Sequence, residues 1–149
     1  MATMSKNEQT ARRYDRLLVE GKVDEAITTC CTPDVQYVVA GEEAPHLTEV
    51  MPWAGYVNRG QEQLKDMYNL MFETVEVVRF DDNEYITDGG DVLAVFGRFF
   101  FKVRTTEVLV ESDFVARLHF RDGKIATNRF FEDRYTFGTA LREGKAAAA

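Results

Sequence analysis

The side chains that could do chemistry in this chain of 149 residues stand among apolar neighbours. Tyr14 lies on an apolar stripe with helical spacing, where its hydroxyl could donate a hydrogen bond to a ligand oxygen or to the backbone. Arg98 is flanked by Phe96 and Phe100 on one strand face. It could therefore bind a carboxylate or oxyanion, or form an ion pair with an acid of a neighbouring strand. Both residues predict a site that holds a ligand oxygen.

A long segment without helical or strand periodicity, residues 41–59, carries further candidates. Loops of this length inside a compact domain are usually functional or mobile. Trp53 and Tyr56 are large amphipathic rings that could cover an apolar ligand as a lid, or could anchor the segment to the core. His46 could shuttle a proton at neutral pH, although the sequence supplies no partner for it.

Other kinds of site are not indicated. The sequence has no glycine-rich phosphate loop, no G-x-S-x-G elbow and no H-E-x-x-H helix, so we expect no nucleotide or other cofactor. Cys30 and Cys31 are adjacent, which matches no zinc spacing and is typical of small buried residues. The 25 acids outnumber the 18 bases and give a net charge of −7, which argues against a nucleic-acid partner.

Composition indicates one domain that spans residues 1–149, with 45% apolar and 29% charged residues. No run of about 20 apolar residues could cross a bilayer, and the polar beginning has no apolar signal region, so we expect a cytoplasmic protein without membrane contact. The closing alanines, 146–149, have no partner pattern. They could be a cloning remnant and are left out of the fold prediction.

Hydrophobic periodicity places three helices ahead of most of the strands. The helices are predicted at Glu8–Glu20, at Val23–Cys30 and from Gly60 onward. This separation favours an α+β fold, with the helices packed on one face of a mostly antiparallel sheet. The predicted strands are Val35–Ala40, Val75–Phe80, Glu84–Thr87, Val92–Val103, Val108–Phe120 and Ile125–Tyr135.

The strand Val92–Val103 is apolar on both faces. An antiparallel sheet commonly leaves one face in water, so a second apolar face needs a cover. A second copy of the chain is the simplest cover. We therefore expect a homodimer that forms through the outer face of the sheet.

Three stretches carry a family resemblance: YDRLLVEGKVD at 14–24, PWAGYVNRGQEQL at 52–64 and GKIATNRFFED at 123–133. Their order and spacing resemble the SnoaL-like, ketosteroid-isomerase-related group of the NTF2-like superfamily, over roughly Glu8 to Arg142. The resemblance implies a cystatin-like cone of three helices on a strongly curved sheet. It also implies an apolar small-molecule cavity inside the cone and frequent dimerisation.

The resemblance does not imply either of the two familiar reactions of this group, because catalytic carboxylates of both are replaced in this sequence. A ketosteroid isomerase uses a carboxylate base, a tyrosine and a protonated aspartic acid. Only the tyrosine has a counterpart, Tyr14, because the base position falls on Val39 and the second acid falls on Ala116. The limonene-epoxide hydrolases use two aspartates and an arginine. Phe130 stands at the position of one of these aspartates. The strand Val92–Val103 should supply the other aspartate and the arginine, but it contains Arg98 and no carboxylate.

Two registers are open for the hairpin that turns at Asp122-Gly123. A bulge at the glycine would place Asn128 and Phe130 on the same face as Phe114 and Ala116, with Glu132 nearer the rim. This register agrees with the family placement of Ala116. In it, Phe114 and Phe130 narrow the cavity and Asn128 supplies a polar contact. A plain two-residue turn would instead bring Arg129, Phe131 and Asp133 to that face, and Asp113 and Asp133 would then be candidate bases.

Together these patterns predict a cavity for a hydrophobic, cyclic ligand, with Tyr14 donating to a ligand oxygen. An enzyme built this way would catalyse proton transfer without a cofactor, as in isomerisation, cyclisation or dehydration, by a base that the sequence does not identify. A carrier domain that only holds its ligand is one alternative. An interaction scaffold with a filled interior is the other.

Overall fold

A computed structural model describes residues 3–39 and 41–148 of the chain. Six strands form one sheet in the order β2-β1-β6-β5-β4-β3, and every neighbouring pair is antiparallel except β1 and β6. The elements are α1 (Lys6–Val19), α2 (Val23–Cys30), β1 (Cys31–Val39), α3 (Pro45–Thr48), β2 (Val57–Arg59), α4 (Gly60–Thr74), β3 (Val75–Thr87), β4 (Val92–Val103), β5 (Leu109–Arg121), β6 (Lys124–Glu132) and α5 (Arg134–Ala148).

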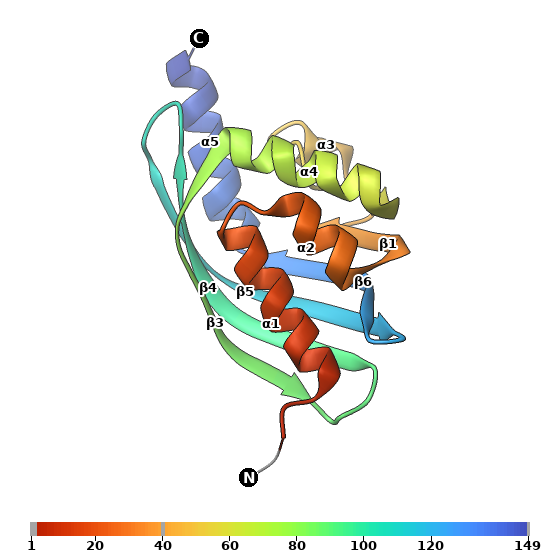
Figure 1. The fold of residues 1–149 in the computed structure, drawn as a ribbon. Helices are drawn as coiled ribbons and strands as arrows, with labels where there is room; N and C mark the ends of the chain where they lie inside the picture. The colour runs from red at the N-terminus through yellow and green to blue at the C-terminus, as the bar shows by residue number, and fades with distance from the viewer. Residues whose placement is uncertain (1–2, 40, 149) are drawn as a thin grey trace.

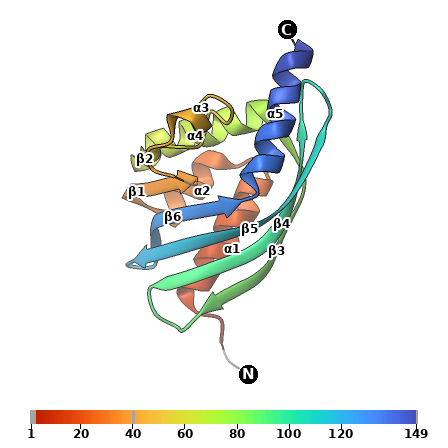
Figure 2. The ribbon, with the colours of Figure 1, turned by 180° about the vertical axis from the view of Figure 1, so that it is seen from behind.

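The sheet bends strongly, and α1, α2 and α4 pack against its inner face (Figure 1 and Figure 2). Helix α1 begins at the N-cap Ser5, whose hydroxyl accepts a hydrogen bond from the Glu8 backbone, and it buries Ala11, Tyr14, Leu17 and Leu18 on one side. The predicted α+β fold is confirmed. No helix in the described part of the chain is long and apolar enough to cross a membrane.

The helix α5 was not predicted. The sequence interpretation extended the last strand to Tyr135, whereas β6 ends at Glu132 and Asp133 caps a helix that continues as far as Ala148. Phe137 anchors α5, with its ring centroid 5.5 Å from that of Trp53 and 5.7 Å from that of Phe99. Of the closing alanines that the fold prediction left out, 146–148 continue α5, and Ala149 lies outside the described residues.

Smaller differences concern the loops and strand ends. The segment 41–59 contains the short elements α3 and β2, and β1 begins at Cys31 rather than at Val35. The predicted strand end at Ala40 lies outside the described residues. The two predicted strands between Val75 and Thr87 form one strand, β3, whose pairing with β4 shifts register twice.

The β5–β6 hairpin has the predicted face but not the predicted bulge. Arg121 pairs with Lys124 across a two-residue turn, and Asp122 and Gly123 both have positive φ, as such a turn requires. The extra residue is Ala126, which falls between the Phe120–Ile125 and His119–Thr127 pairs. Beyond this bulge Phe114 pairs with Glu132, Ala116 with Phe130 and Leu118 with Asn128. The second register is therefore wrong.

Candidate functional site

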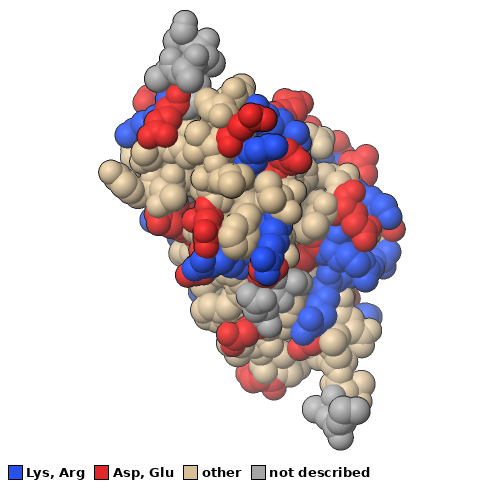
Figure 3. All heavy atoms as spheres, turned by 90° about the vertical axis from the view of Figure 1, so that its left-hand side faces the viewer, with Lys and Arg blue, Asp and Glu red and all other residues tan. Residues whose placement is uncertain are grey.

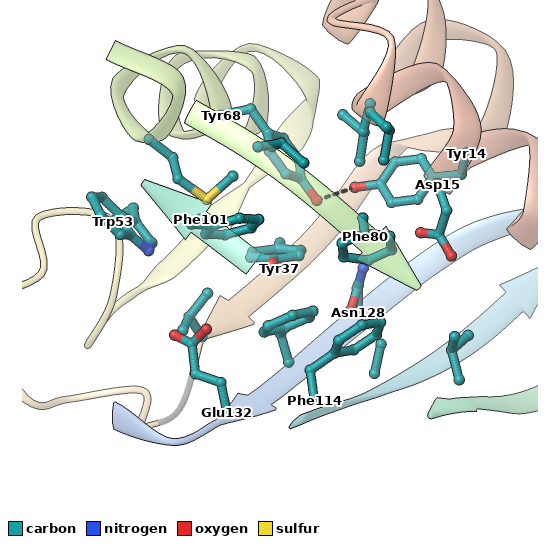
Figure 4. A pocket seen from close by; sticks show the side chains of 18 of the residues that line it. Tyr14, Asp15, Tyr37, Trp53, Tyr68, Phe80, Phe101, Phe114, Asn128 and Glu132 are labelled. Carbon is teal, nitrogen blue, oxygen red and sulfur yellow. Dashed lines mark hydrogen bonds between the residues drawn. The ribbon is translucent and has the colours of Figure 1, made fainter. Parts of the chain in front are cut away.

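A cavity lies between the inner face of the sheet and the helices α1 and α4 (Figure 4). Its volume is about 70 Å³, enough for several water molecules but below the range of roughly 300–1,000 Å³ typical of sites for drug-sized ligands. Most of its wall is apolar. The partly exposed lining residues Val19, Met71, Phe72 and Val77 place the mouth between the C-terminal halves of α1 and α4 and the start of β3.

Three buried tyrosines, Tyr14, Tyr37 and Tyr68, form one polar end of the cavity. The hydroxyls of Tyr14 on α1 and Tyr68 on α4 share a hydrogen bond of 2.6 Å, and the Tyr37 ring on β1 lies 5.6 Å from the Tyr68 ring between centroids. Burial raises the pKa of all three phenols well above the ordinary value. They therefore stay protonated at neutral pH and can donate hydrogen bonds.

Asn128 extends this polar end onto the sheet. It lies beside Tyr37 in the β1–β6 ladder and is only 5% exposed. Its Oδ1 atom is buried and has no hydrogen-bond partner among the residues that the structure describes. A buried acceptor of this kind is costly unless a ligand or water satisfies it.

Stacked aromatic rings form the middle of the cavity. Phe114 stands between Phe80 and Phe130, with ring centroids 4.8 Å and 5.1 Å away. Val39 and Ala116 lie on either side of Phe130 in the sheet. At the positions where the resemblance expected carboxylates, the cavity therefore has an apolar wall.

Glu132 is the ionisable group at the other end of the cavity. It follows Asn128 by four residues on the same face of β6, and Figure 4 shows it on the side of Trp53, across from Tyr14. Its Oε1 atom is buried without a hydrogen-bond partner among the described residues. Burial raises the pKa of the Glu132 carboxyl from 4.5 to about 8, although Arg134 opposes the rise, and Asp133 adds to it.

A second carboxylate, Asp15, lines the cavity at the mouth. The hydroxyl of Tyr85 on β3 donates to its Oδ2 atom over 2.8 Å, which fixes the orientation of the carboxylate. The Arg12 guanidinium stacks on the Tyr85 ring at 4.1 Å from its centroid. In Figure 4 the Asp15 carboxylate lies beside Phe80, away from Glu132.

Most of the residues predicted from the sequence line this cavity: Tyr14, Val39, Trp53, Phe114, Ala116, Asn128 and Phe130. Tyr56 does not. Its hydroxyl donates to the Pro52 carbonyl oxygen over 2.9 Å, so the ring secures its own loop instead of covering the cavity.

Arg98 is the main correction. It lies on the outer face of β4, where its side chain is 43% exposed, Nε donates to Asp113 Oδ1 over 2.8 Å, and Glu111 forms a second ion pair. The expectation of a buried cation was wrong because Phe96, on the same face, is itself 41% exposed. The ion pair with a neighbouring strand, the alternative interpretation, is the observed one.

The other candidates lie apart from the cavity. His46 is exposed on α3, and Asp133 serves as the cap of α5. Cys30 and Cys31 are buried, and burial raises the pKa of the Cys31 thiol to about 12, so it remains an unreactive thiol. Within the described residues, no three His, Cys, Asp or Glu side chains lie close enough together to hold a metal ion.

Tyr37, Tyr68 and Glu132 were missed as site residues. Tyr68 lies on the apolar stripe of its helix and Tyr37 stands beside Val38 and Val39, so the sequence pattern did not single out their hydroxyls. Glu132 was placed near the rim with no chemical role. The register pairing of Phe114 with Glu132 was available as a signal, but the burial that changes the acidity of the carboxyl comes from side chains of distant elements, such as Trp53, that line the same cavity.

Comparison with known proteins agrees with this architecture. A family model described as a SnoaL-like domain matches residues 11–128. Among curated proteins, no sequence matches the chain.

Solved structures share the fold at low sequence identity. An NTF2-like protein from Burkholderia xenovorans LB400 is 20% identical with a TM-score of 0.74, and the alignment covers 91% of this chain and 95% of that one. A candidate isomerase from Rhodopseudomonas palustris is 17% identical over 99% of both chains, with a TM-score of 0.72. A candidate SnoaL-like polyketide cyclase from Jannaschia sp. CCS1 is 18% identical over 95% of this chain and 97% of that one, also with a TM-score of 0.72.

Proposed function

The chain belongs to the SnoaL-like domain family, and from this premise we propose that it is an enzyme that transfers a proton within a small, apolar carbonyl compound. Glu132 is the base, and the Tyr14–Tyr68 pair stabilises the oxygen on which negative charge develops. One observation carries the proposal: a buried carboxyl oxygen without a partner among the described residues faces an apolar cavity whose opposite end is a pair of phenol donors.

The reaction needs two groups with different roles. The Glu132 carboxylate takes a proton from the carbon atom that lies between the carbonyl group and a carbon–carbon double bond of the substrate. The electrons of the broken C–H bond form a new carbon–carbon double bond to the carbonyl carbon, and the π electrons of the carbonyl group move onto its oxygen. Tyr14 or Tyr68 donates a hydrogen bond to that oxygen, which stabilises the enolate. The protonated Glu132 then returns the proton to another carbon atom of the same molecule, and the net result is an isomer.

The environment of Glu132 suits this role. A general base is most effective when its pKa lies near the working pH, and burial brings the pKa of this carboxyl to about 8. The apolar wall also strengthens hydrogen bonds from the tyrosines, because little water competes inside the cavity. The solved structures named as a candidate isomerase and a candidate polyketide cyclase are compatible with this class of reaction.

Substrate size follows from the volume of the cavity. At about 70 Å³ the closed cavity is too small for a large polycyclic compound. Met71 and Phe72, both partly exposed at the mouth, are the side chains that must move to admit a molecule of one or two rings. The stacked rings of Phe114 and Phe130 offer such a molecule a flat surface.

The tyrosine pair can be tested with 5-nitrobenzisoxazole as the probe. A base removes the C–H proton of its isoxazole ring, and the N–O bond breaks. The ring opens to a single product that carries a nitrile group and a coloured nitrophenolate. Replacing Tyr14 with phenylalanine should lower kcat/KM for this reaction by about ten- to a hundredfold, because the phenolate oxygen loses a donor. Absorbance of the released phenolate gives the rate.

Tyr56→Phe is the matched control, since Tyr56 bonds only to the Pro52 carbonyl in the described structure and does not line the cavity. An unchanged rate in Tyr14→Phe would remove the oxyanion role. Binding of the probe without turnover by the wild-type protein would favour the carrier function instead.

We propose in addition that a second copy of the chain covers the outer face of the sheet. Phe96 is 41% and Phe131 is 44% exposed on this face. Val115 lies between them in the ladder, and the ion pairs of Arg98 with Glu111 and Asp113 lie on the same face. Figure 3 shows basic and acidic side chains interleaved with uncharged surface on this side of the molecule. A symmetric dimer joins the same patch on both subunits, so a face that carries both charge signs is complementary to itself.

Phe96→Glu should convert the dimer to a monomer, because two new carboxylates would face each other across the two-fold axis. Leu70→Glu on α4 is the control, since Leu70 is 36% exposed on a helix away from this face. Sedimentation velocity at micromolar concentration measures the outcome. A wild-type protein that sediments as a monomer would contradict the proposal.

A further inference from the structure

Side-chain hydrogen bonds of Asp133 and Ser112 hold the junction between β6 and α5. Asp133 is the single residue between Glu132, where β6 ends, and Arg134, where α5 begins. Its carboxylate accepts from the Thr136 backbone N–H over 3.0 Å and from the Thr136 hydroxyl over 2.7 Å. Asp133 is therefore the N-cap of α5, and these bonds lower the pKa of its carboxyl.

Ser112 on β5 binds the backbone of the same residue. Its Oγ atom accepts a hydrogen bond from the Asp133 N–H over 2.9 Å and donates to the Asp113 carbonyl oxygen over 2.7 Å. Ser112 is 4% exposed and lies two residues before Phe114, the ladder partner of Glu132. The hydroxyl thus ties β5 to the chain one residue beyond the last ladder pair.

We propose that Ser112 is a positioning residue that holds the Glu132 carboxyl inside the cavity by fixing the backbone of Asp133. The inference rests on the proposed role of Glu132 as the base. Ser112 itself does not line the cavity, so it acts on the reaction through Glu132 and not by contact with a substrate.

Geometry explains why this bond matters for Glu132. The side chain of the last strand residue can turn outward when the chain beyond it is free to move. Here Ser112 fixes the following N–H, and α5 continues from the same point and packs Phe137 against Trp53 and Phe101, which line the cavity. Loss of the bond would free the strand end and let water reach the carboxyl.

Three charged or titratable groups near Glu132 affect the pKa of its carboxyl. Arg134 and Asp133 follow it in the chain, and Tyr37 on β1 interacts with it electrostatically across the cavity. Ser112 carries no charge. Any change in Glu132 titration after a substitution at Ser112 therefore reports a change in burial or orientation, because the set of neighbouring charges stays the same.

The experiment is an NMR titration of the Glu132 side-chain carboxyl carbon in protein labelled with ¹³C-glutamate. Glu132→Gln identifies the signal. Ser112→Ala should lower the midpoint by at least one pH unit from the wild-type value while far-ultraviolet circular dichroism stays unchanged. Ser112→Thr keeps the hydroxyl and should restore the midpoint. If Ser112→Ala does not fold, Ser112→Cys, with a weaker acceptor, should give a smaller shift in the same direction.

Ser5→Ala is the matched control, because the Ser5 hydroxyl also accepts a backbone N–H, from Glu8 over 3.1 Å, but at the far end of α1. An equal shift in Ser5→Ala, or an unchanged midpoint in Ser112→Ala or Ser112→Cys, would overturn the positioning role. A wild-type midpoint near 4.5 would instead overturn the proposed function itself, so the two failures are distinguishable.

Discussion

Glu132→Gln should slow the opening of 5-nitrobenzisoxazole by about 10²–10⁴-fold, the range typical for loss of a general base. Glutamine keeps the size and the polar end of the side chain but cannot accept the proton. In the wild-type protein, kcat/KM should rise about tenfold per pH unit below the midpoint and level off above about pH 8, since only the carboxylate form of Glu132 acts as a base. Glu132→Gln should lose this pH dependence.

Glu25→Gln is the matched control for this loss. Glu25 is an exposed residue of α2 that pairs with Arg13 over 3.6 Å, so the same change there should leave the rate within twofold. A profile that falls as the pH rises through 8 would contradict the base role, because it would mean that the protonated carboxyl is the active form. An unchanged rate in Glu132→Gln would contradict it outright.

Titration of Glu132 should also change the free energy of unfolding of the protein. In the folded protein the Glu132 carboxyl has a pKa of about 8. In the unfolded chain we take its pKa to be the ordinary value of 4.5. Between these values the folded state keeps a proton that the unfolded state has lost. The favourable contribution is therefore complete below pH 4.5, falls as the pH rises and is gone by about pH 8. The total loss is on the order of 4–5 kcal/mol at 1.36 kcal/mol per pKa unit.

Urea unfolding of the wild type and of Glu132→Gln at a series of pH values measures this loss. Other groups titrate equally in both proteins, so the difference between the two free energies of unfolding isolates Glu132. The wild type should lose stability relative to the variant from pH 4.5 to pH 8 and stay level above that range. A difference that does not change with pH would show that the carboxyl titrates alike in the folded and unfolded states.

Much of the fold could be predicted from the sequence, because the spacing of apolar residues indicates which side of a helix or strand is buried. The helix stripes that contain Tyr14 and Leu64 and the alternation along β5 appear directly in the sequence. The shared face of Ala116 and Phe130 was also predicted correctly, although the extra residue is Ala126 and not the turn glycine.

The failures have physical reasons. Helix α5 was missed because the apolar run of β6 continues through Phe131 toward Tyr135, and the Asp133–Thr136 cap that ends the strand was not recognised. Arg98 was misplaced because both faces of β4 are apolar, so alternation alone did not tell the inner face from the outer one.

The site was only partly predictable for a related reason. Tyr14 and Asn128 could be placed from helix and strand position alone. The acidity of Glu132 could not, because burial raises its pKa and the cavity that buries it is built from elements far apart in the sequence, including Trp53. Its hydrogen-bonding state likewise depends on contacts between elements far apart in the sequence.

The titration of the Glu132 carboxyl in the wild-type protein, followed by its ¹³C chemical shift, tests most directly whether the cavity holds a base. We expect one transition with a midpoint at about pH 8, produced by burial beside the apolar wall of the cavity. A midpoint near pH 4.5, the ordinary value for a hydrated glutamate, would contradict the central claim that this chain holds a base inside its cavity.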